Sequence, residues 1–148
     1  MSTDEAVTND LIETLEDGKE GFSKAADQLD GSDSPELGTM FRQFSDQRAT
    51  FSAELREMAK DYGDQIHESG SVAATLHRGW MSLKDALAGS DPEGVLDAAE
   101  MGEDHAIKEY DKALAADISA GLRTVVQRQS LEVKAAHDKV KALRDAKA

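Results

Sequence analysis

The sequence predicts an all-α protein built from four long helices in two antiparallel hairpins. Apolar residues recur three and four positions apart through most of the chain, which is typical of helices with one buried face. The only two prolines, Pro35 and Pro92, stand where helices would begin. Aromatic residues are few, and valine, isoleucine and threonine do not cluster as they would in strands.

Length and composition limit the kinds of site that the chain can carry. The 148 residues suit a single domain over 1–148, which buries roughly 68–70% of its unfolded surface. The absence of cysteine excludes disulfides, thiolate metal sites and a cysteine nucleophile. A net charge of −13 repels nucleic acid and anionic lipid, so we expect neither a nucleic-acid nor a membrane partner.

The sequence also predicts a cytoplasmic location. The acidic start, residues 1–7, has no apolar run, so we expect no signal peptide. No stretch approaches the 18 apolar residues of a membrane span.

The first hairpin joins helices expected at about 4–29 and 35–62. When the residues of the two apolar faces are paired across the hairpin, the two residue numbers in every pair add up to the same value. A single antiparallel register requires this. This register places Gly18 opposite Arg48, the one polar residue on the inner face of the second helix. The glycine would leave room for an arginine that points inward; the alternative is an arginine that extends outward to solvent.

The second half contains a long connection and another hairpin. A helix at about 72–87 lies within the connection and is long enough to carry the chain back along the bundle. Helices at about 92–116 and 120–146 follow. Four long helices in two hairpins, joined by one long crossover that holds a short fifth helix, form the layout of ferritin-like bundles.

Four polar residues fall near mid-height on the inner faces of these helices or beside them, namely Arg48, Glu103, Gln129 and Glu132. We expect one buried polar layer in which Arg48 binds Glu103 at two points, because the planar guanidinium matches a carboxylate. Gln129 and Glu132 would satisfy the remaining groups of the layer.

A metal site at the same height is the competing interpretation. Ferritin-like di-iron proteins take one glutamate from each of two helices and Glu-x-x-His from each of the other two. The strict motif is absent, since His105 follows Glu103 by only two positions and so faces away. A degenerate site holding iron or another divalent metal would use Glu103, Glu132 and Glu54.

No other catalytic constellation is evident. Phosphate-binding loops, nucleophile elbows and zinc-protease motifs are absent from the sequence. We expect the histidines to be surface or rim residues: His67, His77, His105 and His137. The sequence therefore predicts no catalytic residue and no cofactor.

Several motifs together resemble a known family. They are Leu15-Glu16-Asp17-Gly18-Lys19-Glu20-Gly21-Phe22, Arg48 with Phe51 and Glu54-Leu55, Leu76-His77-Arg78-Gly79-Trp80, and Glu100-Met101-Gly102-Glu103-Asp104 with Tyr110. Over about residues 9–145 the chain resembles the uncharacterised bacterial four-helix-bundle family classed as a ferritin-like domain of unknown function. The resemblance implies a bacterial, cytoplasmic, ferritin-like protein, and it brings no catalytic residues with it.

These observations favour a non-catalytic, acidic bundle protein with a structural or stress-related role. The alternative is a metal-binding ferritin-like protein. The sequence identifies no protein partner. It leaves a homo-oligomer open, to which Leu131 on the outer side of the last helix would contribute.

Overall fold

The computed structural model describes residues 3–29, 35–60 and 92–147, and these form four long α-helices with no strand among them. The helices are α1 (Thr3–Leu29), α2 (Pro35–Ala59), α4 (Pro92–Ala115) and α5 (Ala120–Lys147). The predicted all-α bundle is confirmed. The described ends of α1, α4 and α5 lie within one residue of the predicted ends. The crossover at 63–90 and its helix at 72–87 lie outside the described residues.

The helix starts follow from local chemistry. α1 carries the acids Asp4 and Glu5 in its first turn, where their negative charges interact favourably with the positive end of the helix dipole. α2 and α4 both begin on a proline, whose fixed φ and missing N–H suit the first helical position. At the start of α5 the Ser119 hydroxyl accepts a hydrogen bond from the backbone N–H of Leu122.

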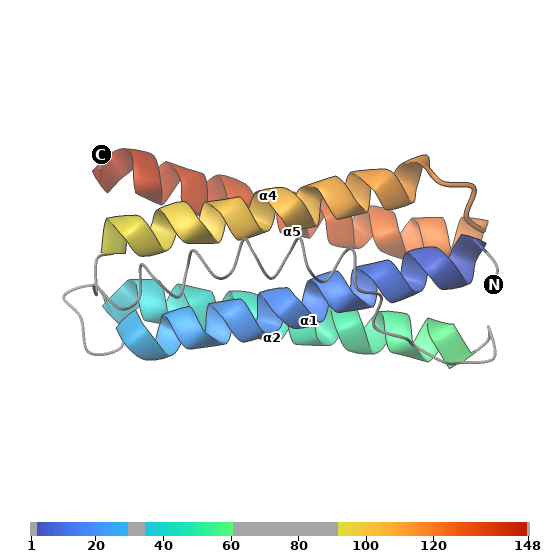
Figure 1. The fold of residues 1–148 in the computed structure, drawn as a ribbon, viewed down its shortest axis with the longest axis horizontal. Coiled ribbons are helices and arrows are strands. Elements are labelled where there is room, and N and C mark those ends of the chain that lie inside the picture. The colour runs from blue at the N-terminus through green and yellow to red at the C-terminus, as the bar shows by residue number, and fades with distance from the viewer. Residues whose placement is uncertain (1–2, 30–34, 61–91, 148) are drawn as a thin grey trace.

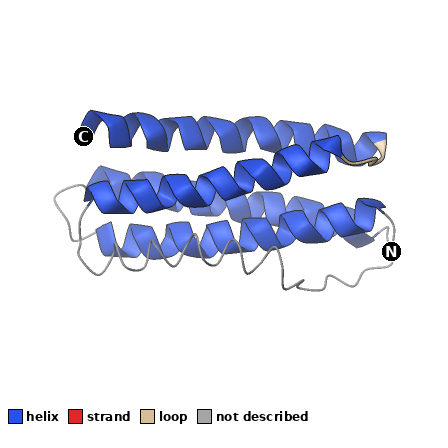
Figure 2. Ribbon diagram, turned by 45° about the horizontal axis from the view of Figure 1, so that its top comes forward, coloured by secondary structure: helices blue, strands red, loops and turns tan. Residues whose placement is uncertain are grey.

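Side chains from α5 and α1 make hydrogen bonds to the backbone of the turn between α4 and α5. Arg123 donates to the backbone oxygens of Leu114 at 2.7 Å and Ala116 at 2.9 Å, near the end of α4. Asp4 Oδ1 accepts from the backbone N–H of Ser119 at 2.9 Å. The start of α1 therefore lies against this turn (Figures 1 and 2).

The helices form two antiparallel hairpins laid side by side (Figure 1). α1 packs along α2 and α4, and α5 packs along α4 and touches α2. α2 ends and α4 begins at opposite ends of the bundle, so these two helices run in the same direction (Figure 1). None of the helices in the described ranges has the length and hydropathy that crossing a membrane would require.

The inner faces match the predicted apolar stripes, and the core they form has two parts. One cluster gathers residues from 22–29, 37–44, 95–99 and 136–140, including a trio of aromatic rings, Phe22, Phe41 and Phe44. The other gathers residues from 11–15, 51–55, 106–118 and 122–133. Arg48 and Glu103 lie in the sequence gaps between these ranges, so the polar pair divides the apolar core.

Candidate functional site

A buried ion pair joins α2 to α4 at mid-bundle. Arg48 Nη1 lies 2.6 Å from Glu103 Oε1, and Arg48 Nη2 lies 2.7 Å from Glu103 Oε2. The side chains are 2% and 0% exposed. Both carboxylate oxygens thus accept from one planar guanidinium, which is the strongest geometry for this pair of groups.

The surroundings of Arg48 support its charged form. The guanidinium carbon lies 5.3 Å from the centre of the Phe22 ring, and Nε donates to Gln47 Oε1 at 3.2 Å. Burial alone would lower the pKa of Arg48, but attraction to Glu103 and the hydrogen bonds with it prevail and raise the pKa. Arg48 therefore keeps its positive charge.

Gly18 faces this arginine, as the predicted register of the first hairpin requires. A Cβ atom at Gly18 would lie 3.6 Å from Cγ and 3.7 Å from Nη1 of Arg48. These are ordinary van der Waals distances. A methyl group would therefore fit, and the expectation that Arg48 needs the space left by a glycine requires correction.

A second polar chain runs from the core to the surface. The Tyr110 hydroxyl donates to Gln129 Oε1 at 2.7 Å, and Gln129 Nε2 donates to Glu54 Oε1 at 2.9 Å. Glu54 also pairs with Arg128. Burial raises the pKa of Tyr110 above its usual range, so the phenol keeps its proton and acts as a donor.

This arrangement corrects two parts of the predicted layer. Gln129 is buried, but its hydrogen bonds go to Tyr110, Glu54 and the Phe51 carbonyl rather than to the ion pair. Glu132 is exposed. Contacts between α4 and α5 join Tyr110 to Gln129 and Asp104 to His137, so the part of α5 level with Glu103 lies close to His137, about two turns beyond Gln129.

The residues of the predicted degenerate metal site are not brought together. Glu103 is held by Arg48, Glu54 is held by Arg128 and Gln129, and Glu132 is exposed. Within residues 3–29, 35–60 and 92–147, the side chains whose ligand atoms converge are instead Glu100, Asp104 and His137.

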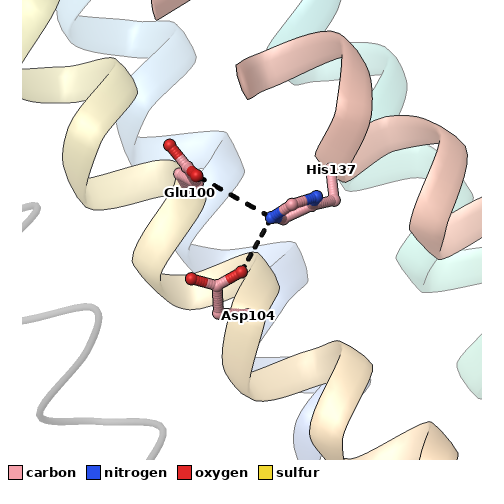
Figure 3. A group of neighbouring side chains, drawn as sticks. All are labelled: Glu100, Asp104 and His137. Atoms are coloured by element: carbon pink, nitrogen blue, oxygen red, sulfur yellow. Dashed lines mark ion pairs between the residues drawn. The ribbon is translucent and has the colours of Figure 1, made fainter. Parts of the chain in front are cut away.

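This second group lies on the seam between α4 and α5 (Figure 3). His137 Nε2 is 2.7 Å from Asp104 Oδ1 and 3.9 Å from Glu100 Oε1. Glu100 and His137 are mostly buried, with side chains 12% and 14% exposed, whereas Asp104 is 52% exposed. Arg144 contacts the other oxygen of Glu100.

His137 was expected to be an ordinary rim residue, and sequence reasoning missed this group. Glu100 and Asp104 are four residues apart and so share one face of α4. Recognising their histidine partner also needs the register of α5 against α4. Once Gln129 is paired with Tyr110, that register brings His137 to the level of these two acids.

The two constellations have different chemical capacities. The Arg48–Glu103 pair is closed, because each charge is neutralised by the other and shielded from water. The Glu100–Asp104–His137 group combines an imidazole with two carboxylates and is open to solvent on the Asp104 side.

Comparison with known proteins identifies a family but no function. The family model described as "Domain of unknown function (DUF2383)" matches residues 5–116, which include most of α1 and all of α2 and α4. A search of curated proteins finds no match to the chain.

Proposed function

The chain belongs to the family described as a domain of unknown function (DUF2383), and from this premise we propose that it is a non-catalytic, ferritin-like bundle protein. The proposed role is structural or stress-related, in the bacterial cytoplasm, within one domain over residues 1–148. In this proposal the Arg48–Glu103 pair occupies the place where di-iron bundles hold their metals.

The observation that carries the proposal is the guanidinium at mid-bundle. Arg48 is 1% exposed and engages both oxygens of Glu103. Metal cations bound beside Glu103 would be repelled by the positive charge of Arg48. They would also have to displace Arg48 from the carboxylate. The pair thus uses the inner glutamate of α4 for structure.

The helix directions support the ferritin-like part of the proposal. α2 and α4 are parallel, as the single long crossover of that layout requires (Figure 1). In a simple up-and-down bundle, consecutive long helices are antiparallel.

The alternative, an iron protein with a degenerate carboxylate site, receives less support from the contacts. Its members Glu54 and Glu103 are both paired with arginines, and Glu132 faces solvent. Binding iron there would require breaking a buried ion pair.

The test is iron chemistry at the bundle centre. Protein purified without chelator is analysed for metal, and iron(II) is then titrated in air while ferric absorbance is followed. We expect oxidation at the rate of buffer alone. The matched variant is the double replacement Arg48→Met with Glu103→Leu, which fills the same volume with apolar atoms. Stoichiometric iron or rapid oxidation, if this double variant abolishes it, would contradict the proposal. Iron that remains in the double variant is bound elsewhere on the chain.

A further inference from the structure

We propose that Glu100, Asp104 and His137 bind a single Zn²⁺ ion on the seam between α4 and α5. The inference goes beyond the proposed function and does not depend on it, because none of these residues belongs to the mid-bundle ion pair. It rests on the spacing of the ligand atoms, on a buried nitrogen without a hydrogen bond and on the side chains that orient the ligands.

The spacing suits one ion. One ligand atom from each residue can be chosen so that all lie within 4.8 Å of one another. Zinc bonds of about 2.0–2.2 Å in a tetrahedral site place neighbouring ligand atoms about 3.3 Å apart. His137 Nε2 lies 2.7 Å from Asp104 Oδ1 and 3.9 Å from Glu100 Oε1, on either side of that value. Small side-chain rotations are therefore enough to form the site.

His137 Nε2 is directed toward the two carboxylates of the group (Figure 3). It is a buried atom that makes no hydrogen bond within the described part of the chain. Asp104 Oδ1 is close to it, but the contact lacks hydrogen-bond geometry. A nitrogen that lies between two carboxylates and is not engaged in a hydrogen bond with either is placed to bind a cation together with them.

Neighbouring side chains prepare the ligands. His137 Nδ1 lies 3.3 Å from Asp138 Oδ1, and an Nδ1–H donated to this carboxylate leaves the Nε2 lone pair for the metal. Arg144 binds Glu100 Oε2 and so turns Oε1 toward the imidazole. The positive charge of Arg144 does not oppose a cation strongly, because Asp145 lies 3.1 Å from its Nη2.

The donor set selects the class of ion. Mg²⁺ and Ca²⁺ prefer sites made wholly of oxygen ligands, whereas an imidazole with carboxylates suits zinc and its neighbours in the first transition row. Three protein ligands leave one position of the tetrahedron for water. The exposed Asp104 provides access from solvent.

A Zn²⁺ ion bound by Glu100, Asp104 and His137 would link α5 to α4. Glu100 and Asp104 lie within the part of the chain that matches the family, while His137 lies on the helix after it. An ion bound by both helices stabilises the folded hairpin over the unfolded chain, so Zn²⁺ should raise the Tm as its concentration exceeds the Kd.

The test is calorimetric titration of Zn²⁺ into the metal-free full chain. We expect one ion per chain and a loss of affinity of more than tenfold in both His137→Gln and Glu100→Gln. The control is His105→Gln, which makes the same change on α4 outside the group and should bind as the wild type does. Asp138→Asn should weaken binding by roughly 10–100-fold, because it removes only the group that orients His137.

The imidazole nitrogen signals identify the ligand directly, even if a variant folds poorly. In the wild-type protein, Zn²⁺ should shift the Nε2 resonance of His137 and leave the other histidines unchanged. An absence of binding would overturn the proposal. So would several weakly bound ions that are unaffected by His137→Gln, since these would be adventitious ions on an acidic surface. Circular dichroism of each variant confirms that lost binding is not lost folding.

Discussion

Arg48 and Glu103 form a buried ion pair whose net contribution to stability is expected to be small. Taking both charges out of water costs several kcal/mol for each ion, and their mutual attraction with two short hydrogen bonds offsets that cost. We expect the pair to set the register of α2 against α4, because the arginine of α2 meets the glutamate of α4 in only one register.

The first prediction compares single and double replacement of this pair. Glu103→Ala or Arg48→Ala should each lose about 3–5 kcal/mol of unfolding free energy, since each leaves a charge buried alone. Arg48→Met combined with Glu103→Leu should lose much less, because no uncompensated charge remains. Urea unfolding measures all three variants. Single variants that unfold at the wild-type midpoint would show that the pair is not buried in solution.

The second prediction concerns the other polar chain. Tyr110→Phe removes the donor to Gln129 Oε1 and leaves a buried acceptor unsatisfied, which should cost about 1–3 kcal/mol. Adding Gln129→Leu to Tyr110→Phe should recover part of this loss, because both partners are then apolar. The same urea experiment measures the pair, and equal losses in the single and double variants would argue against the hydrogen bond.

The third prediction concerns two glutamates whose pKa values shift in opposite directions. Burial raises the pKa of Glu109 despite attraction to Lys112, and repulsion from Asp10 adds to the rise. Burial also opposes ionisation of Glu16, but Lys19 and Arg56 outweigh it and lower the pKa of that carboxyl. Carbon-detected titration by NMR should find Glu109 titrating above the usual glutamate range and Glu16 below it.

The sign of each stability effect follows from linkage. Folding favours protonated Glu109, so stability is lost as pH rises through its raised pKa, and Glu109→Gln should stabilise the protein at neutral pH. Folding favours ionised Glu16, so its contribution is present at neutral pH and is lost as pH falls through the lowered pKa. Glu16→Gln should therefore destabilise at neutral pH by roughly 0.2–1 kcal/mol, a small value because the carboxylate is partly exposed. Changes of the same sign in both variants would contradict this account.

At the scale of the helices, the inner face of α1 contains a glycine that the packing does not require. The space next to Arg48 accepts a methyl group at ordinary contact distance. Gly18→Ala should therefore stabilise the protein by about 0.5–1 kcal/mol, because alanine is the better helix former. Thermal unfolding measures the change, with Gly121→Ala, which meets nothing within 4 Å, as a second helical glycine for comparison. A lower Tm for Gly18→Ala would mean that the arginine needs the full space.

The helices themselves could be predicted from the sequence, because their signals are local. Pro35 and Pro92 mark two starts, and the spacing of apolar residues identifies the buried faces of all four described helices. The partners Arg48 and Glu103 could also be proposed, since each interrupts an otherwise apolar stripe.

The other contacts of the site depend on the register of α5 against α4, which no local sequence pattern predicts. The predicted layer placed Gln129 level with Glu103, whereas Gln129 bonds to Tyr110 about two turns away along α4. The Glu100–Asp104–His137 group could not be predicted for the same reason. His137 can be recognised as a ligand only when the register places it opposite Glu100 and Asp104. Interhelical register is fixed by packing over the whole interface rather than by any one residue.

At the scale of the whole molecule, the dominant feature is a net charge of −13. Repulsion among these charges opposes the compact state, and salt screens it over a Debye length of about 8 Å at physiological ionic strength. Raising sodium chloride from low to physiological concentration should therefore raise the Tm. Chloride is preferred to sulfate, because sulfate also strengthens apolar burial. A Tm that falls with added salt would show that surface ion pairs outweigh the net repulsion.

The Arg48–Glu103 ion pair lies at the bundle centre, and we propose that no metal binds there. The most direct test is an anomalous difference map from crystals of the full chain soaked in iron(II) without oxygen and, separately, in Zn²⁺. We predict no anomalous peak between Arg48 and Glu103 in either map, with both side chains in contact as described. A metal peak bound by Glu103, with the Arg48 side chain displaced, would contradict this prediction.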